Sequence, residues 1–182
     1  MLKGSIPAII TPFSKGEVDF DSFAKLLKWQ IKEGISGVTV CGTTGESPTL
    51  THDEHMQLVE FAVKVSGKKI PVIAGTGSNS TKEAIEFTKH AYKSGADYGL
   101  VVTPYYNKPN QKGLVNHFKK IAKVTRSVSR RHGMRSRPAT CHSSASRPQR
   151  ERASPLLVVW PSSSARSPCR MASRWAMRGC VP

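Results

Sequence analysis

The stretch GVTVCGTTGESPTLTHDEHMQLVEFAVKVSGKKIPVIAGTG, residues 37–77, decides the fold. A short apolar run rich in β-branched residues leads through a glycine- and threonine-rich turn into a helical pattern, and a second apolar run follows. Thr51 and Glu54 have capping-box spacing at the expected start of the helix. Gly67 stands where a left-handed residue would end it. The stretch therefore predicts a strand–helix–strand unit.

The same unit recurs on both sides of this stretch, four times in all over residues 1–124. The expected strands are Ile6–Thr11, Gly37–Cys41, Ile70–Ala74 and Tyr98–Thr103. The expected helices carry apolar residues at helical spacing, the fourth over about Gln111–Lys123. Repetition at about 30 residues indicates an α/β fold with parallel strands. The period fits either an open doubly wound sheet or part of an eight-stranded barrel, and both bind ligands at the carboxyl ends of the strands.

Charge divides the chain of 182 residues, whose net charge is +16, into two parts near residue 124. Residues 1–124 contain 16 Lys and no Arg, whereas residues 125–182 contain 12 Arg, 12 Ser and no Lys. One interpretation is an out-of-frame tail without a selected role, and its composition predicts disorder. The alternative is an Arg/Ser-rich arm that binds RNA or another polyanion. The abrupt change from lysine to arginine favours the first interpretation, because no folding constraint requires it.

Several classes of protein are disfavoured by the sequence. No apolar run reaches the roughly 18 residues of a membrane-spanning helix, and Pro7 and Pro12 interrupt the start, so no signal peptide is expected. The cysteines form no C-x-x-C pair, so neither a zinc site nor a disulfide framework is indicated. His52 and His55 are only three residues apart without a third ligand, so no metal site is expected there. A cytoplasmic location is the expectation.

Hydroxyl groups collect at the expected strand ends. Thr43 and Thr44 lie in the Gly42–Glu46 turn, where they could hold a carboxylate or phosphate, or simply belong to a tight turn. Gly75-x-Gly77 is a weak nucleotide motif, and a tight turn is the better interpretation. Tyr105 and Tyr106 point to opposite sides of the fourth strand end, where a phenol could relay a proton or only pack.

The motifs GSIPAIITPF, GVTVCGTTGES, HDEH, IPVIAGTGSNST and VVTPYYNKPNQ resemble the 4-hydroxy-tetrahydrodipicolinate synthase (dihydrodipicolinate synthase) family from residue 1 to about 123. The paired tyrosines of TPYYN favour this family over the related sialic-acid lyases. The resemblance implies a (β/α)₈ TIM barrel, usually a tetramer, that works without a cofactor in lysine biosynthesis. A lysine forms a Schiff base with pyruvate, and the resulting enamine attacks aspartate semialdehyde.

The resemblance also assigns roles to residues. It implies that Thr44 binds the pyruvate carboxylate, that Thr43 belongs to a proton relay, and that Tyr106 completes the relay from a neighbouring subunit. It further implies a lysine-inhibitor site at a dimer interface. The matching positions are His52, His55, Asn79, Glu83 and Tyr105.

The chain departs from the family after Lys123. The family's Y-N-x-P strand end, its arginine and its Schiff-base lysine do not follow, and residues 125–182 contain no Lys and no Tyr. The expectation is therefore half a barrel, residues 1–124, followed by a tail, residues 125–182. We expect the chain to lack the condensation activity, because a Schiff base needs an amine.

Overall fold

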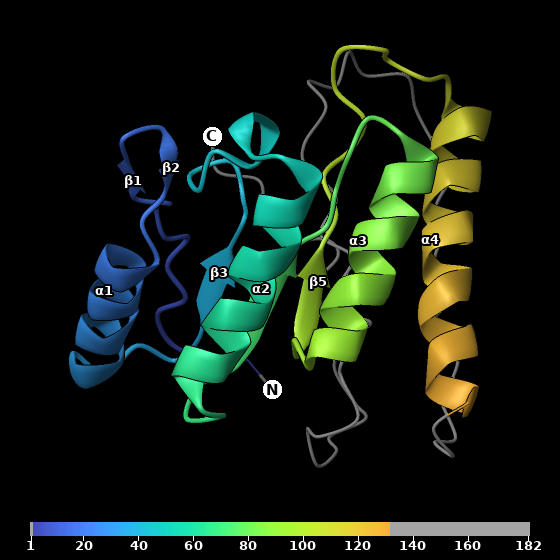
Figure 1. Ribbon diagram of the computed structural model, residues 1–182. Coiled ribbons are helices and arrows are strands. Elements are labelled where there is room, and N and C mark those ends of the chain that lie inside the picture. The colour runs from blue at the N-terminus through green and yellow to red at the C-terminus, as the bar shows by residue number, and fades with distance from the viewer. Residues whose placement is uncertain (1, 132–182) are drawn as a thin grey trace, which may run out of the picture.

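The computed structural model of the chain describes residues 2–131 (Figure 1). Its central feature is a parallel sheet in the order β3 (Val38–Val40), β4 (Val72–Gly75) and β5 (Tyr98–Leu100). The helices α1 (Phe20–Lys32), α2 (His52–Ser66), α3 (Thr81–Ser94) and α4 (Gln111–Arg131) alternate with the strands along the chain. Three of the four expected strands are thereby confirmed, each shorter than expected.

The expected strand Ile6–Thr11 is not a regular strand. It forms one parallel bridge, Ala8 with Thr39, at the β3 edge of the sheet. Two backbone hydrogen bonds flank the bridge: the Ile9 N–H donates to the Thr39 carbonyl at 3.1 Å, and the Thr39 N–H donates to the Pro7 carbonyl at 2.9 Å. Pro7 and Pro12 lack an N–H group, which limits the ladder that this segment can form.

A short antiparallel hairpin, β1 (Phe13–Ser14) and β2 (Glu17–Val18), follows this segment and was not expected from the sequence. Its two turn residues, Lys15 and Gly16, have φ angles of 54° and 88°. Positive φ at both positions is typical of the two-residue turns that match the twist of paired strands. The hairpin brings the chain to Asp19, whose carboxylate accepts a hydrogen bond from the Ser22 N–H at 2.9 Å and caps α1.

The expected caps of α2 and α3 are present. At α2 the Thr51 hydroxyl accepts from the Glu54 N–H, and the Glu54 carboxylate accepts from the Thr51 N–H, which is a complete capping box. At α3 the Ser80 hydroxyl accepts from the Glu83 N–H at 3.4 Å. The two helices end at Gly67 and Gly95, both left-handed as predicted.

Helix α4 continues to Arg131, eight residues beyond the expected end at Lys123. The expectation that regular structure stops at about Thr125 is therefore wrong for residues 125–131. No glycine or proline occurs between Gly113 and Gly133, so nothing in the sequence forces the helix to end earlier. The disorder predicted for the rest of the tail, and most of the proposed polyanion-binding arm, lie outside the described residues.

The four helices lie side by side in chain order on one face of the sheet (Figure 1). The larger apolar cluster joins β3 and β4 to α1 and α2, and includes Phe23, Leu27, Leu58 and Val59. A smaller cluster lies between α3 and α4, where Ala84, Val101 and Ile121 are buried. The described residues thus form an α/β layer of four βα units, with the strand-end turns at one edge.

Candidate functional site

The turn after β3 displays two hydroxyl groups at the carboxyl end of the strand. Two successive backbone bonds shape it: the Gly45 N–H donates to the Gly42 carbonyl, and the Glu46 N–H donates to the Thr43 carbonyl, both at 3.1 Å. The Thr43 and Thr44 side chains between them are exposed. An exposed hydroxyl next to a turn can donate a hydrogen bond to a carboxylate oxygen. The position predicted for these two residues is therefore confirmed, whereas their roles stay predictions.

Buried contacts hold this turn against the N-terminal segment. The Thr11 hydroxyl donates to the Gly45 carbonyl at 2.7 Å. A side chain at Gly45 would bring its Cβ within 3.1 Å of the Ile9 carbonyl oxygen, closer than ordinary packing allows. The single-bridge segment and the turn after β3 are thus fixed to each other, so the two threonines are presented on a supported loop.

The glycines of the Gly75-x-Gly77 motif allow backbones to approach closely. A Cβ at Gly75 would collide with the Cys41 backbone, and one at Gly77 would collide with the Val102 backbone. Thr76 between them is fully buried and accepts a hydrogen bond from the Thr88 hydroxyl at 3.2 Å. This arrangement agrees with the structural interpretation of the motif, because Thr76 is buried and bonded within the fold.

Tyr105 and Tyr106 both lie in the loop after β5, where their surroundings differ. The Tyr105 N–H donates to the Asn79 side-chain oxygen at 2.8 Å, and the Asn107 amide donates to the Asn79 carbonyl at 3.3 Å. Tyr106 is 91% exposed. Within residues 2–131, no hydrogen bond joins the Tyr106 phenol to Thr43, so the two predicted relay residues are not paired there.

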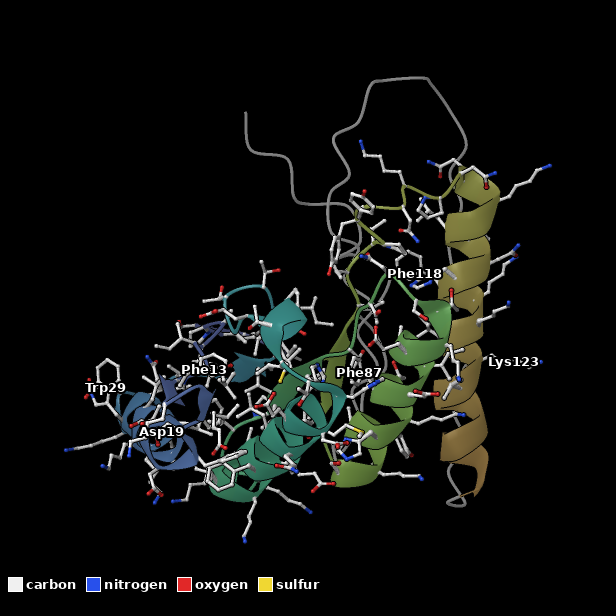
Figure 2. The ribbon with its side chains drawn as sticks, turned by 45° about the horizontal axis from the view of Figure 1, so that its top comes forward. Phe13, Asp19, Trp29, Phe87, Phe118 and Lys123 are labelled. Carbon is white, nitrogen blue, oxygen red and sulfur yellow. The ribbon has the colours of Figure 1, made fainter. Side chains whose placement is uncertain are left out.

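A second group of polar residues gathers at the N-terminal ends of α2 and α3. The His52 imidazole lies 3.9 Å from the Glu83 carboxylate and 4.0 Å from that of Glu86. Phe87 contacts both histidines of α2: its ring centroid is 4.4 Å from that of His52 and 3.9 Å from that of His55, which it stacks upon. The Phe87 side chain points between the two helices in Figure 2.

His55 is the buried member of this group. Only 2% of its surface is exposed, and its Nε2 atom has no hydrogen-bond partner among the described residues. Burial lowers the pKa of His55 from 6.5 to about 4, against a smaller opposing effect of a backbone hydrogen bond with Gly75. The ring is therefore neutral at pH 7. It packs on Phe87, which in turn contacts the exposed His52.

Four of the five residues predicted for an inhibitor site form two pairs, and the fifth, His55, stacks on Phe87. His52 contacts Glu83, and Asn79 binds the backbone of Tyr105. Ser78, which precedes Asn79 in the chain, belongs to the same region: its hydroxyl donates to the Glu83 carboxylate and accepts from the Ser80 N–H at 3.0 Å. Sequence reasoning missed Ser78, although its place two residues before a helix cap was a usable signal. It also missed the contact of Phe87 with the two histidines of α2, since the spacing of Phe87 on α3 indicated only core packing.

A partly buried polar contact connects α3 with α4 and was not predicted. The Thr81 hydroxyl lies 2.9 Å from His117 Nδ1, and burial lowers the pKa of His117. No group of three or more His, Cys, Asp or Glu side chains within residues 2–131 is placed to hold a metal ion. In the same range, no helix combines the length and the apolar character needed to cross a bilayer.

Comparison with known proteins gives one consistent result. A model of the Dihydrodipicolinate synthetase family matches residues 1–128. The 4-hydroxy-tetrahydrodipicolinate synthase of Thermodesulfovibrio yellowstonii is 60% identical over 125 residues, which are 69% of this chain and 43% of that protein. The chain thus spans about two fifths of the length of the curated relatives that it matches.

Two solved structures share the described fold. The chloride-inhibited dihydrodipicolinate synthase of Acinetobacter baumannii, complexed with pyruvate, is 51% identical with a TM-score of 0.66, covering 68% of this chain and 43% of that one. The enzyme of Cyanidioschyzon merolae, with lysine bound, is 46% identical with a TM-score of 0.63, covering 65% and 41%. The fold is therefore that of the (β/α)₈ barrels, of which the described residues form a part.

Proposed function

Because the chain belongs to the dihydrodipicolinate synthetase family, we propose that its described part is the pyruvate-carboxylate and proton-relay portion of a lyase site in lysine biosynthesis. The observation that carries this proposal is the supported turn after β3, which presents the exposed Thr43 and Thr44 hydroxyls at the carboxyl end of a parallel strand. Ligands of α/β folds bind at that end. A cytoplasmic location and an oligomeric assembly belong to the same proposal.

In this proposal Thr44 donates a hydrogen bond to the carboxylate of pyruvate. The pyruvate complex of the Acinetobacter baumannii enzyme supports this substrate for the family. Thr43 holds a proton on the adjacent relay, and the highly exposed Tyr106 is free to complete that relay in a neighbouring subunit. The partner substrate is aspartate semialdehyde, which the pyruvate enamine would attack.

The covalent step needs a lysine amine, and we propose that this chain does not supply it. All 16 lysines lie in residues 1–124, and Lys108 lies in the loop after β5. Lys108 is exposed, so it lacks the desolvated pocket that activates a Schiff-base lysine. The chain would then bind pyruvate reversibly without forming a Schiff base.

Two measurements test this proposal together. Saturation-transfer NMR should detect pyruvate binding that Thr44→Val abolishes, whereas the matched variant Thr43→Val, on the same turn, should retain it. Borohydride treatment in the presence of labelled pyruvate should leave no stoichiometric adduct. Equal loss of binding in both variants would contradict the role of Thr44, and specific labelling of any lysine would contradict the missing covalent step.

The cluster on α2 and α3 supports a second ligand, an amino acid of the lysine type. The Glu83 carboxylate could pair with an ammonium group, and the Asn79 and Tyr105 side chains lie on the adjacent loops. The lysine complex of the Cyanidioschyzon merolae enzyme supports this ligand. Calorimetric titration with L-lysine should show binding that Glu83→Gln weakens more than Glu86→Gln, since Glu86 is outside the predicted set. An equal effect of both variants would indicate only general electrostatic attraction.

A further inference from the structure

Helix α4 differs sharply in charge from the other helices. It carries four lysines and three arginines without a single acidic residue. Helix α2 carries three acidic residues against one lysine, while α1 and α3 each mix lysines with acidic residues. The seven positive charges of α4 are therefore not balanced by any acidic residue of the same helix.

Five of the seven basic positions of α4 fall on one side of the helix. At 100° per residue, positions 112, 119, 123, 126 and 130 lie within a sector about 60° wide. With a rise of 1.5 Å per residue, this row is roughly 27 Å long. Lys112, Lys119 and Lys123 are exposed, and Figure 2 shows Lys123 pointing away from the rest of the molecule. We define these three lysines, with helix positions 126 and 130, as the basic row.

The opposite side of α4 is occupied by its packing against α3. Ile121 is 1% exposed, His117 contacts Thr81, and Phe118 packs on the smaller apolar cluster. No carboxylate of the described residues lies within 4.0 Å of the lysines of the basic row. The three lysines of the row are thus exposed cations held at regular spacing by a docked helix, without a carboxylate partner among the described residues.

We propose that the basic row binds the phosphate backbone of a nucleic acid. A line of unpaired cations releases condensed counterions when it contacts a polyphosphate, and this release drives sequence-independent binding. An anionic membrane fits less well, because a membrane-bound amphipathic helix needs a free apolar face, and that of α4 is buried against α3. This surface is independent of the strand-end turns and of the function proposed for them.

The test uses the full chain and a fluorescently labelled single-stranded RNA, with anisotropy measured at several salt concentrations. Neutralising three contacts should lower the slope of log K against log salt by about 2, from roughly 0.7 per contact. We expect this for the triple variant K112Q/K119Q/K123Q. The matched control is K25Q/K28Q/K32Q, which removes the same charge from exposed positions of α1 and should leave the slope unchanged.

A charge-conserving triple variant, K112R/K119R/K123R, should keep both the slope and the affinity, and circular dichroism should show the parental helix content in each variant. An equal reduction by the α1 and α4 triples would overturn the proposal, because net charge alone would then explain binding. An unchanged slope in K112Q/K119Q/K123Q would also overturn it. Stronger binding to phosphatidylserine vesicles than to RNA, with the same dependence on the basic row, would replace the nucleic acid with a membrane.

Discussion

The centre of the described fold and the α3–α4 seam differ in how they are held together. At the centre, β3 and β4 share one apolar cluster with α1 and α2, and Leu27 and Leu58 are fully buried in it. At the seam, Ile121 is the one fully buried apolar side chain among residues 111–124 of α4, and His117 makes a polar contact with Thr81. Among the residues whose burial is described, the centre therefore holds many more buried apolar side chains than the seam does.

This difference teaches that the molecule should not open uniformly. Regions with little buried apolar area open at a lower free-energy cost than the core, so α4 should exchange its amide protons before α2 does. The strand-end turn with Thr43 and Thr44 belongs to the centre, whereas Tyr105 and Tyr106 belong to the loop that leads into α4. The threonines and the tyrosines of the candidate site thus belong to regions of unequal stability.

The largest expected effect comes from a cavity at the centre. Leu58→Ala should lower the free energy of unfolding by about 2–5 kcal/mol, because a fully buried leucine loses both its transfer free energy and its packing. Denaturant titration with far-UV circular dichroism measures this loss. Ile121→Ala at the seam is the counterpart, and hydrogen exchange should show its effect concentrated in α4. Equal acceleration of exchange in α2 and α4 by Ile121→Ala would remove the distinction between centre and seam.

Acidification should weaken the centre through His55. Its folded-state pKa of about 4 lies below the value near 6.5 of an exposed histidine, so the unfolded state binds the proton first as the pH falls. The stability is thus fully present above pH 6.5 and decreases towards pH 4, by about 3 kcal/mol at 1.36 kcal/mol per pH unit. Unfolding titrations across this range should show the decrease.

His55→Phe tests the assignment, since a phenylalanine keeps an aromatic ring beside Phe87 without a titrating group. This variant should flatten most of the pH dependence between 4 and 6.5. The remainder should come from other groups, among them His117, because burial also lowers the pKa of that residue. A variant with the parental pH profile would show that His55 is not the group responsible.

Sequence reasoning identified the centre better than the seam, for physical reasons. The Thr51 capping box and the left-handed Gly67 are local signals, and both formed as predicted. The single bridge at Ala8 depends on which partner reaches it, and the Lys15–Gly16 hairpin is too short to leave a strand pattern. These features are decided by tertiary contacts, which a periodicity cannot reveal.

The candidate site shows the same division. Thr43 and Thr44 could be placed because a turn after an apolar strand must lie at the strand end. The contact between His52 and Glu83 joins two helices, and only the family resemblance grouped these residues before the structure did. His117 remained unnoticed, because its partner Thr81 is 36 residues away and no motif links them.

The two helix caps should differ by a smaller amount. Thr51→Ala removes the hydroxyl that accepts from the Glu54 N–H and donates to the Glu54 carboxylate, so a loss of about 1 kcal/mol is expected. Ser80→Ala should lose less, because the Glu83 carboxylate binds Ser78 and makes no bond with the Ser80 hydroxyl, so only the bond from the Glu83 N–H is lost. Thermal or denaturant unfolding of the two variants compares them directly. A larger loss in Ser80→Ala would reverse the ranking of the two caps.

The smallest expected effect concerns the ion pair that joins the centre to the seam. His90 on α3 and Glu60 on α2 lie 2.8 Å apart, with Glu60 largely exposed. Exposed pairs of this kind contribute roughly 0.2–1 kcal/mol, because solvent screens them and two side chains lose freedom. A double-mutant cycle with Glu60→Gln, His90→Gln and the combined variant should give a coupling energy in this range, decreasing as salt is added. A coupling near zero would mean that this pair does not help to hold α3 against the centre, and that the other contacts, chiefly Phe87 with the histidines of α2, do so.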